Sequence, residues 1–205
     1  MGLGESLPSS AQRRGAGRCG PPKGRNPGAE DAAGPKRPGD QRARELAGET
    51  IPDLVLDSSM GEPVELVAWV GWKVLYLVPG VPASAAGDAT EHLAFVGLRE
   101  VFASRVVQVL GVSVQSRSEL LGLTVKLGIE HPLLADPTLA LARSLDLPTL
   151  REGDRECYAR MVLILDGLLI RHAFYPIDEP GRAPDQALAW LRLNGGGGHG
   201  GYLGA

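Results

Sequence analysis

The residues that could do redox or metal chemistry are few in this chain of 205 residues. Its two cysteines, Cys19 and Cys157, lie far apart, and neither belongs to a Cys-x-x-Cys pair. The four histidines also lack the spacing, with cysteines or with each other, that metal sites require. We therefore expect no structural disulfide, no bound metal and no cofactor.

Cys157 is the one cysteine close to other residues of chemical interest, because it precedes Arg160 by three positions. It could be a redox thiol. However, the sequence around it contains no recognisable base or helix N-terminus that would lower the pKa of the thiol. The simpler interpretation is an ordinary cysteine in a loop or at the start of a strand, and a redox role stays open as the alternative.

Ser84, Asp88 and His92 form a second group of reactive residue types. Serine, histidine and aspartate are the members of a nucleophilic triad, but closeness in sequence does not indicate triad geometry. Asp88 comes just before a predicted helix, where a carboxylate suits the N-cap and the positive end of the helix dipole. We interpret Asp88 as a cap and predict no triad.

The element that must position these residues is the apolar run KVLYLV, residues 73–78. Glycine and proline bound it on both sides, so it is typical of a strand buried on both faces. The Pro/Gly-rich loop 79–88 follows, and residues 89–104 have the apolar spacing of an amphipathic helix. A helix N-terminus would then lie over the carboxyl end of the central strand, where we expect the functional site.

The remaining apolar runs predict further strands. Residues 51–57 and 64–66 flank a turn cluster and predict a small hairpin, and residues 106–114 predict a second buried strand. Residues 129–136 form a short extended segment. Residues 158–165 and 168–175 predict a hairpin, with Asp166 and Gly167 as its turn.

Three more helices are predicted between and after these strands. A helix is predicted over residues 117–127. Ser116 is its N-cap, Glu119 is at the capping-box position, and Gly128 ends it. Residues 137–145 and 183–193 predict the other two helices, and residues 151–156 a charged loop. The order hairpin–β–α–β–α–β–α–β–β–α predicts an α/β fold, a thioredoxin-like three-layer sandwich with an N-terminal hairpin and a mixed central sheet.

Composition divides the chain into three parts. Residues 1–46 are rich in Gly, Pro, Arg and Ala and contain nine basic and five acidic residues, a charge of +4 in a chain whose total is −3. We expect this segment to be a disordered basic tail, more simply an inert extension than a contact to RNA or membrane. Residues 47–193 form the predicted domain, with a charge of −7, and residues 194–205 a Gly-rich flexible tail.

Charge and hydropathy also limit the partners and the location. A formal charge of −3 argues against a nucleic-acid surface. No apolar run approaches the roughly 18 residues of a membrane span, and the first residues lack a signal-peptide pattern. We therefore expect a cytoplasmic protein that binds neither nucleic acid nor membrane.

Several segments, taken together, resemble a known family. IPDLVLDSSMGEPVEL and KVLYLVPG, then VVQVLGVSVQS, LGIEHPLLADPTLALARSLDLPT, ARMVLILDGLLIRHAFYP and DQALAWL, are similar to peroxiredoxins of the alkyl hydroperoxide reductase/thiol-specific antioxidant family. The resemblance spans residues 47–193. It implies a peroxiredoxin-type thioredoxin fold and peroxide reduction by a cysteine thiolate in the first turn of the helix after the central strand. It also implies a thioredoxin-type reductant or a homodimer partner.

The family's catalytic cysteine has no counterpart at that place. The family pattern is close to P-G-x-C-T-x-E, yet no cysteine occurs between Pro79 and Phe95. Alignment on Glu91 and Phe95 places Asp88 at the cysteine position, whereas alignment on Pro82 places Ser84 there. A serine hydroxyl or a carboxylate cannot replace a thiolate in attack on an O–O bond.

Other site positions of the family do match. They are Pro79 with Gly80, Pro82, Glu91, and Arg160, which aligns with the arginine that opens the strand facing the active site. Three hypotheses follow. The protein is a peroxiredoxin-like protein with weak or no thiol peroxidase activity, or a binding or scaffold module that uses the same fold, or an active peroxidase that uses a relocated Cys157.

Overall fold

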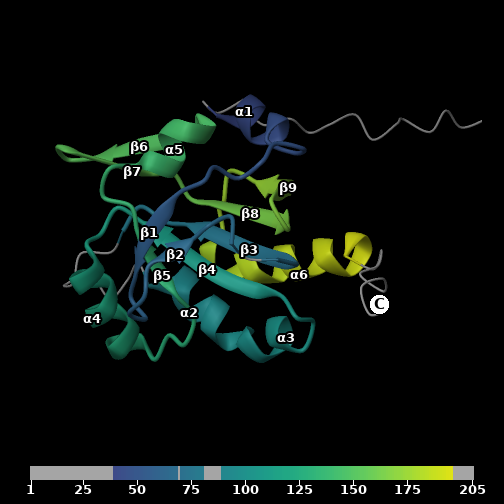
Figure 1. The fold of residues 1–205 in the computed structure, drawn as a ribbon, viewed down its shortest axis with the longest axis horizontal. Helices are drawn as coiled ribbons and strands as arrows, with labels where there is room; N and C mark the ends of the chain where they lie inside the picture. Colours follow the sequence, from purple (N-terminus) through teal and green to yellow (C-terminus); the bar gives the residue numbers. More distant parts are fainter. Residues whose placement is uncertain (1–38, 69, 81–88, 196–205) are drawn as a thin grey trace, which may run out of the picture. The chain divides into compact units, whose positions relative to one another are not determined.

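The computed structural model describes residues 39–68, 70–80 and 89–195 (Figure 1). Seven strands in this part form one mixed sheet in the order β2-β1-β5-β4-β3-β8-β9, and β6 and β7 form a separate hairpin. The strands are β1 (Val55–Ser58), β2 (Val64–Glu65), β3 (Trp72–Leu77), β4 (Gln108–Ser113), β5 (Leu133–Ala135), β6 (Thr149–Glu152), β7 (Arg155–Tyr158), β8 (Met161–Asp166) and β9 (Leu169–Phe174).

Strand β3 lies at the centre of the sheet, as its apolar run predicts. It pairs in parallel with β4, where Val74 faces Val109, and antiparallel with β8, where Val74 faces Ile164. Five of its six residues are buried. The expected central position is therefore confirmed, with the strand beginning one residue earlier than predicted.

Helices cover both faces of the sheet (Figure 1). Leu75 and Leu77 face the side of α1 and α5, whereas Val74 and Tyr76 face the side of α2, α3, α4 and α6. The predicted three-layer arrangement is confirmed. The helices are α1 (Asp40–Glu45), α2 (Thr90–Gly97), α3 (Arg99–Ala103), α4 (Arg117–Leu127), α5 (Ala140–Leu145) and α6 (Ala183–Asn194), with a 3-10 turn, η2, at Pro180–Arg182. None of these helices is both long and apolar enough to cross a bilayer.

The capping signals of α4 are confirmed in full. Ser116 accepts a hydrogen bond from the backbone N–H of Glu119, whose side chain accepts one from the backbone of Ser116, and Gly128 ends the helix in a left-handed conformation. By contrast, the single helix expected over residues 89–104 is two helices. The backbone leaves the helical conformation at Leu98, between α2 and α3.

Helix α1 differs from the expectation of a disordered segment up to residue 46. Ala43 and Leu46 are buried in the core beside α5. Arg42 binds the Glu49 carboxylate at 2.8 Å and donates to the carbonyl of Leu145, also at 2.8 Å. One leucine and one arginine with specific partners thus anchor a segment of low average hydrophobicity. Residues 1–38 and 196–205, which hold the rest of the two predicted tails, lie outside the described residues.

Two further local predictions need correction. Residues 151–156, expected as a loop, belong to the hairpin of β6 and β7, in which Leu150 pairs with Cys157. Gly153, with a φ of 62°, permits its tight turn. The predicted hairpin of β8 and β9 is confirmed, but its turn residues are Gly167 and Leu168, because Asp166 pairs with Leu169 in the ladder.

Candidate functional site

The carboxyl end of β3 is fixed by a buried Pro79–Gly80 pair. Gly80 has a φ of 109°, and a Cβ atom there would lie 3.2 Å from Cγ of Gln115. Both the conformation and the space therefore favour glycine. Pro82, Ser84 and Asp88, which the sequence places at the site, lie outside the described residues, so the structure resumes at Ala89.

Helix α2 begins at Thr90, and its N-cap position falls on Ala89 rather than on Asp88, where the sequence predicts a cap. The N-cap makes no side-chain capping bond. The first turn contains the buried Glu91 and the exposed Thr90. The described start of this helix therefore offers a hydroxyl and a carboxylate but no thiol.

Glu91 and Arg160 are brought together across 69 positions of the chain. An Nη atom of Arg160, which directly precedes β8, donates to the Glu91 carboxylate at 3.1 Å. The Glu91 side chain is fully buried, and that of Arg160 is largely so. A carboxylate in such a place requires a cationic partner, because removing one member of a buried pair leaves an uncompensated charge.

Beneath this pair, the hydroxyl of Tyr76 lies between two buried histidines. It is 2.9 Å from Nδ1 of His92 and 2.7 Å from Nε2 of His131. The Tyr76 ring stacks on Phe95 with 4.2 Å between centroids. A Cβ atom at Gly111 would lie 2.7 Å from the Tyr76 hydroxyl, so glycine on β4 makes the space for the ring.

Burial favours the neutral forms of Tyr76 and His131. Burial raises the pKa of Tyr76 well above its ordinary value and lowers the pKa of His131 to about 4. A phenol has one proton, so its hydroxyl donates to one histidine and accepts an N–H from the other. These bonds join α2 to β3 and to the segment before β5, and so hold the helix that carries Glu91.

Cys157 lines a cavity of about 260 Å³ that also reaches Pro79 and Gly80. The other lining residues are polar: Gln115, Glu119, Glu152 and Arg155. The thiol is buried, and its closest hydrogen-bond acceptor is the carbonyl of Arg155 at 3.9 Å. In the sequence, Cys157 is close only to Arg160. The fold also brings it to the carboxyl end of the central strand β3.

The surroundings of Cys157 do not favour its thiolate form. Burial raises the pKa of the thiol, and the nearby Glu152 carboxylate raises it further, against a smaller opposing effect of Arg155. Activated cysteines need the opposite setting, with cations or a helix N-terminus that lowers the pKa. No group of three or more His, Cys, Asp or Glu side chains among the described residues could hold a metal ion.

His92 and His131 are the site residues that sequence reasoning missed. Both are buried in the structure. The available signal is weak. His92 follows the core position Glu91 in a helix whose next buried residue is Phe95, and only the packing of β3 places Tyr76 beneath it.

Comparison with known proteins adds to this geometry. The AhpC/TSA family model matches residues 47–173. No curated protein matches the chain.

Several solved structures are similar. Peroxidoxin BcpB from Mycobacterium tuberculosis is 22% identical and has a TM-score of 0.64, over 73% of this chain and 97% of that one. Peroxiredoxin Q from Xanthomonas campestris is 27% identical with a TM-score of 0.63, over 72% and 98%. A structure of the bacterioferritin comigratory protein of the same organism, described by its alkyl peroxide reduction activity, is 28% identical with a TM-score of 0.63, over 72% and 98%.

Proposed function

The chain belongs to the AhpC/TSA family, and on this premise we propose that it is a peroxiredoxin-like protein with weak or no thiol peroxidase activity. The family reaction needs a thiolate that attacks the O–O bond, becomes a sulfenic acid and releases an alcohol or water. The sequence has no cysteine from Pro79 to Phe95. The observation that carries the proposal is the start of α2, where Ala89, Thr90 and Glu91 occupy the N-cap and first turn.

The remaining parts of the family site support a retained pocket without its nucleophile. Arg160 is paired with Glu91 at 3.1 Å, so its charge is already compensated. Such a pair can orient a polar substrate or hold the helix in place, but it forms no covalent intermediate. We assign Pro82 to the loop of this site, and Asp88 or Ser84 to the position that the cysteine holds in the family.

A second candidate function is peroxide reduction by Cys157. The observation in its favour is the cavity that Cys157 shares with Pro79 and Gly80. Because the pKa of this thiol is raised, little thiolate would be present at neutral pH, and turnover would be slow and would increase with pH. A thioredoxin-type reductant would then be needed to regenerate the thiol. A cytoplasmic location, where thiols stay reduced, is part of both candidates.

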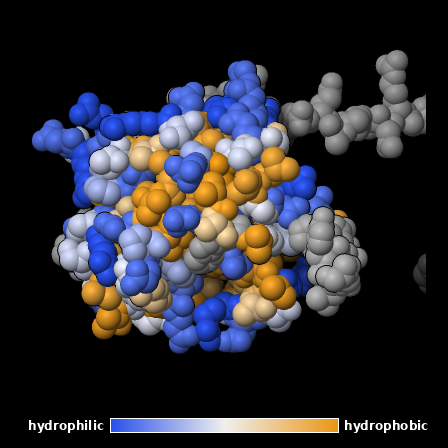
Figure 2. Space-filling model, in the orientation of Figure 1, coloured by the Kyte–Doolittle hydropathy of each residue, from blue (hydrophilic) through white to orange (hydrophobic). Residues whose placement is uncertain are grey.

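A third candidate is a binding or scaffold module, including a homodimer. Figure 2 shows hydrophobic side chains gathered across the middle of one face, with hydrophilic side chains around them. Val55 on β1 is 60% exposed, and Leu169 on β9 is also exposed. Native mass spectrometry of the purified protein tests this candidate, since a dimer or a co-purified partner appears directly as added mass.

Peroxide consumption by the purified protein separates the enzymatic candidates. The substrates are hydrogen peroxide and tert-butyl hydroperoxide, with a thioredoxin system or dithiothreitol as reductant. The variants are Asp88→Cys, Ser84→Cys and Cys157→Ser. We expect the unmodified protein to be near the background rate. Asp88→Cys should raise turnover by at least about tenfold and more than Ser84→Cys, because residue 88 directly precedes the N-cap Ala89, close to the helix end that lowers the pKa of a thiol.

The same assay contains the result that would overturn the proposal. Brisk turnover by the unmodified protein that Cys157→Ser abolishes would make Cys157 a relocated catalytic residue. The change Cys19→Ser serves as the matched control, because it removes the other thiol and should leave every rate unchanged.

A further inference from the structure

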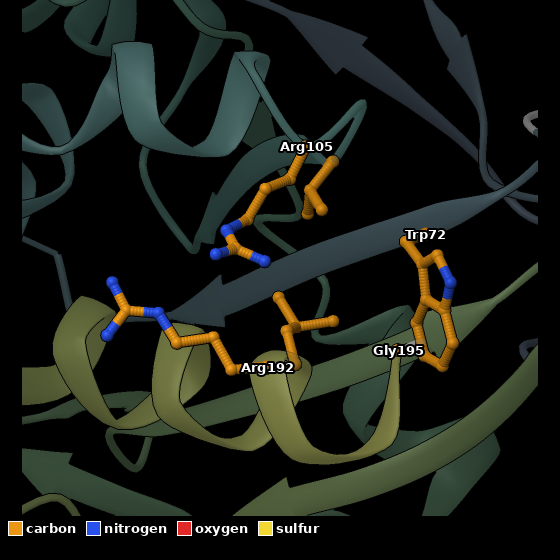
Figure 3. A pocket seen from close by; sticks show the side chains of 6 residues that line it. Trp72, Arg105, Arg192 and Gly195 are labelled. Atoms are coloured by element: carbon orange, nitrogen blue, oxygen red, sulfur yellow. The ribbon is translucent and has the colours of Figure 1, made fainter. Parts of the chain in front are cut away.

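A second cavity, of about 220 Å³, lies at the opposite end of the sheet from Pro79 and Gly80 (Figure 3). Trp72 begins β3 and Val107 precedes β4, so the cavity opens at the amino ends of the two central parallel strands. Five steps along β3 separate Trp72 from Leu77, which is about 17 Å of strand. This cavity is therefore distinct from the candidate site described above.

One wall of the cavity is apolar and firmly held. Trp72 packs edge to face on Trp190 of α6, with 6.1 Å between ring centroids and 65° between ring planes. Trp190 in turn stacks on His172 of β9 at 5.4 Å. Val107 and Leu191 complete the apolar lining. The indole of Trp72 thus offers a fixed surface on which a flat or apolar group can lie.

The other lining groups are two arginines. Figure 3 shows the Arg105 side chain extending from the turn before β4 toward α6, which carries Arg192, while Trp72 lies near Gly195. Neither Arg105 nor Arg192 makes an ion pair or a side-chain hydrogen bond with another described residue. The carboxyl end of α6 opposes an anion here, but its dipole equals only about half a charge against two full positive charges.

The turn that presents Arg105 is strained. Val106, between the lining residues Arg105 and Val107, has a φ of 56° and is 84% exposed. A β-branched residue in the left-handed region is an outlier, and glycine or asparagine normally takes this place after a helix. Backbone strain of this kind often accompanies a functional site. Here the two residues that flank Val106 both line the cavity.

We propose that this cavity binds a small organic anion, a carboxylate or phosphate that carries an apolar group. Arg105 and Arg192 would hold the oxyanion, because guanidinium groups match its geometry with several N–H donors. The apolar part would lie on Trp72 and Leu191. At about 220 Å³ the cavity is smaller than typical drug-sized sites, so a ligand with a single ring fits its size.

Isothermal titration calorimetry of the full-length protein with phenyl phosphate tests this site. We expect saturable binding with a Kd of about 1 mM or tighter, as small ligands of this size reach. Arg105→Gln and Arg192→Gln should each weaken binding about tenfold, as the loss of a charge-assisted hydrogen bond does. Arg151→Gln is the matched control, since Arg151 is an exposed arginine on β6 that does not line the cavity.

Two further measurements make the test specific. Inorganic phosphate should bind more weakly than phenyl phosphate, and Trp72→Phe should reduce this difference. The indole N–H signal of Trp72 in a ¹H–¹⁵N spectrum, assigned by its loss in the Trp72→Phe variant, should shift on titration. Absence of saturable binding at 10 mM phenyl phosphate (about tenfold above the expected Kd), or equal loss in the Arg151→Gln control, would overturn the proposal.

Discussion

The hydroxyl of Tyr76 links the central strand to two buried histidines, one of them on α2. It satisfies Nδ1 of His92 and Nε2 of His131 at once. Nδ1 of His131, in contrast, has no hydrogen-bond partner among the described residues. A buried polar group without a partner costs free energy, so this hydroxyl compensates two histidines that the core would otherwise not tolerate.

Removing that hydroxyl should therefore destabilise the fold. We expect Tyr76→Phe to lower the free energy of unfolding by about 1–3 kcal/mol, because it keeps the stacking on Phe95 but leaves both ring nitrogens unsatisfied. Urea denaturation measures the change. The double variant Tyr76→Phe with His131→Leu should recover part of the loss, and an unchanged midpoint in Tyr76→Phe would contradict the assigned role of the hydroxyl.

The same group predicts how stability depends on pH. His131 has a folded-state pKa of about 4, below the value of 6.5 for an exposed histidine. As the pH falls through 6.5 the unfolded chain takes up a proton that the folded chain refuses, so stability is lost as the pH falls from about 6.5 to about 4. When the pH falls from 7 to 5, this histidine should lower the free energy of unfolding by about 2 kcal/mol.

Urea denaturation at the two pH values checks this expectation. The pKa of His172 is also lowered by burial, so this residue contributes in the same direction. The variant His131→Asn separates the contributions of His131 and His172, because it removes only the pH dependence of stability that is due to His131. An equally steep pH dependence in His131→Asn and in the unmodified protein would count against the prediction.

At the scale of elements, short turns decide how helices meet the sheet. The helical pattern of residues 89–104 continues through Leu98, but the chain bends there, and α3 ends in a turn in which Val107 donates to the carbonyl of Phe102 at 3.0 Å. That turn requires a left-handed residue, and the sequence supplies Val106. Local propensity therefore disagrees with the structure at this turn, which leads directly into β4.

Relieving this strain should stabilise the protein. We expect Val106→Gly to raise the free energy of unfolding by about 1 kcal/mol, since the strain removed exceeds the entropy that glycine adds to the unfolded chain. Val125 is the matched control, because it is 77% exposed but lies inside the regular helix α4. Val125→Gly should destabilise by about 0.5 kcal/mol. Thermal and urea denaturation distinguish the opposite signs.

At the scale of the whole molecule, the folded unit is longer than the family match. The match begins at residue 47, yet α1 and Leu46 pack against the sheet and α5 before that point. Arg42 adds bonds to Glu49 and to the carbonyl of Leu145. The segment before the matched region is thus part of the core on one face.

Truncation tests this boundary. Removal of residues 1–38 should change the free energy of unfolding by less than about 0.5 kcal/mol relative to the full-length protein, because we expect that segment to be a tail. Removal of residues 1–46 should cost at least about 3 kcal/mol, since it deletes the buried Leu46 and exposes the surface it covers. Equal stability of the two truncated proteins, measured by urea denaturation, would show that α1 contributes nothing.

The sequence by itself determined the elements whose signals are local. The apolar run of β3, the caps of α4 and the hairpin of β8 and β9 each depend on residues within a few positions of one another. The family resemblance also follows from such segments in order. It predicts Glu91 and Arg160 as site residues. The sequence contains no cysteine from Pro79 to Phe95.

Only the tertiary structure decided which of these residues meet. Glu91 contacts Arg160 across 69 positions, and Tyr76 contacts His131 across 55. Cys157 lines the same cavity as Gly80 because it lies in the β6–β7 hairpin. The charged residues 151–156 do not predict this hairpin from sequence. Such contacts arise from the order of strands in the sheet and the packing of helices upon it. The periodicity of apolar residues along the chain does not predict these contacts. They form between residues far apart in sequence when the two faces of one sheet are each buried in a hydrophobic core.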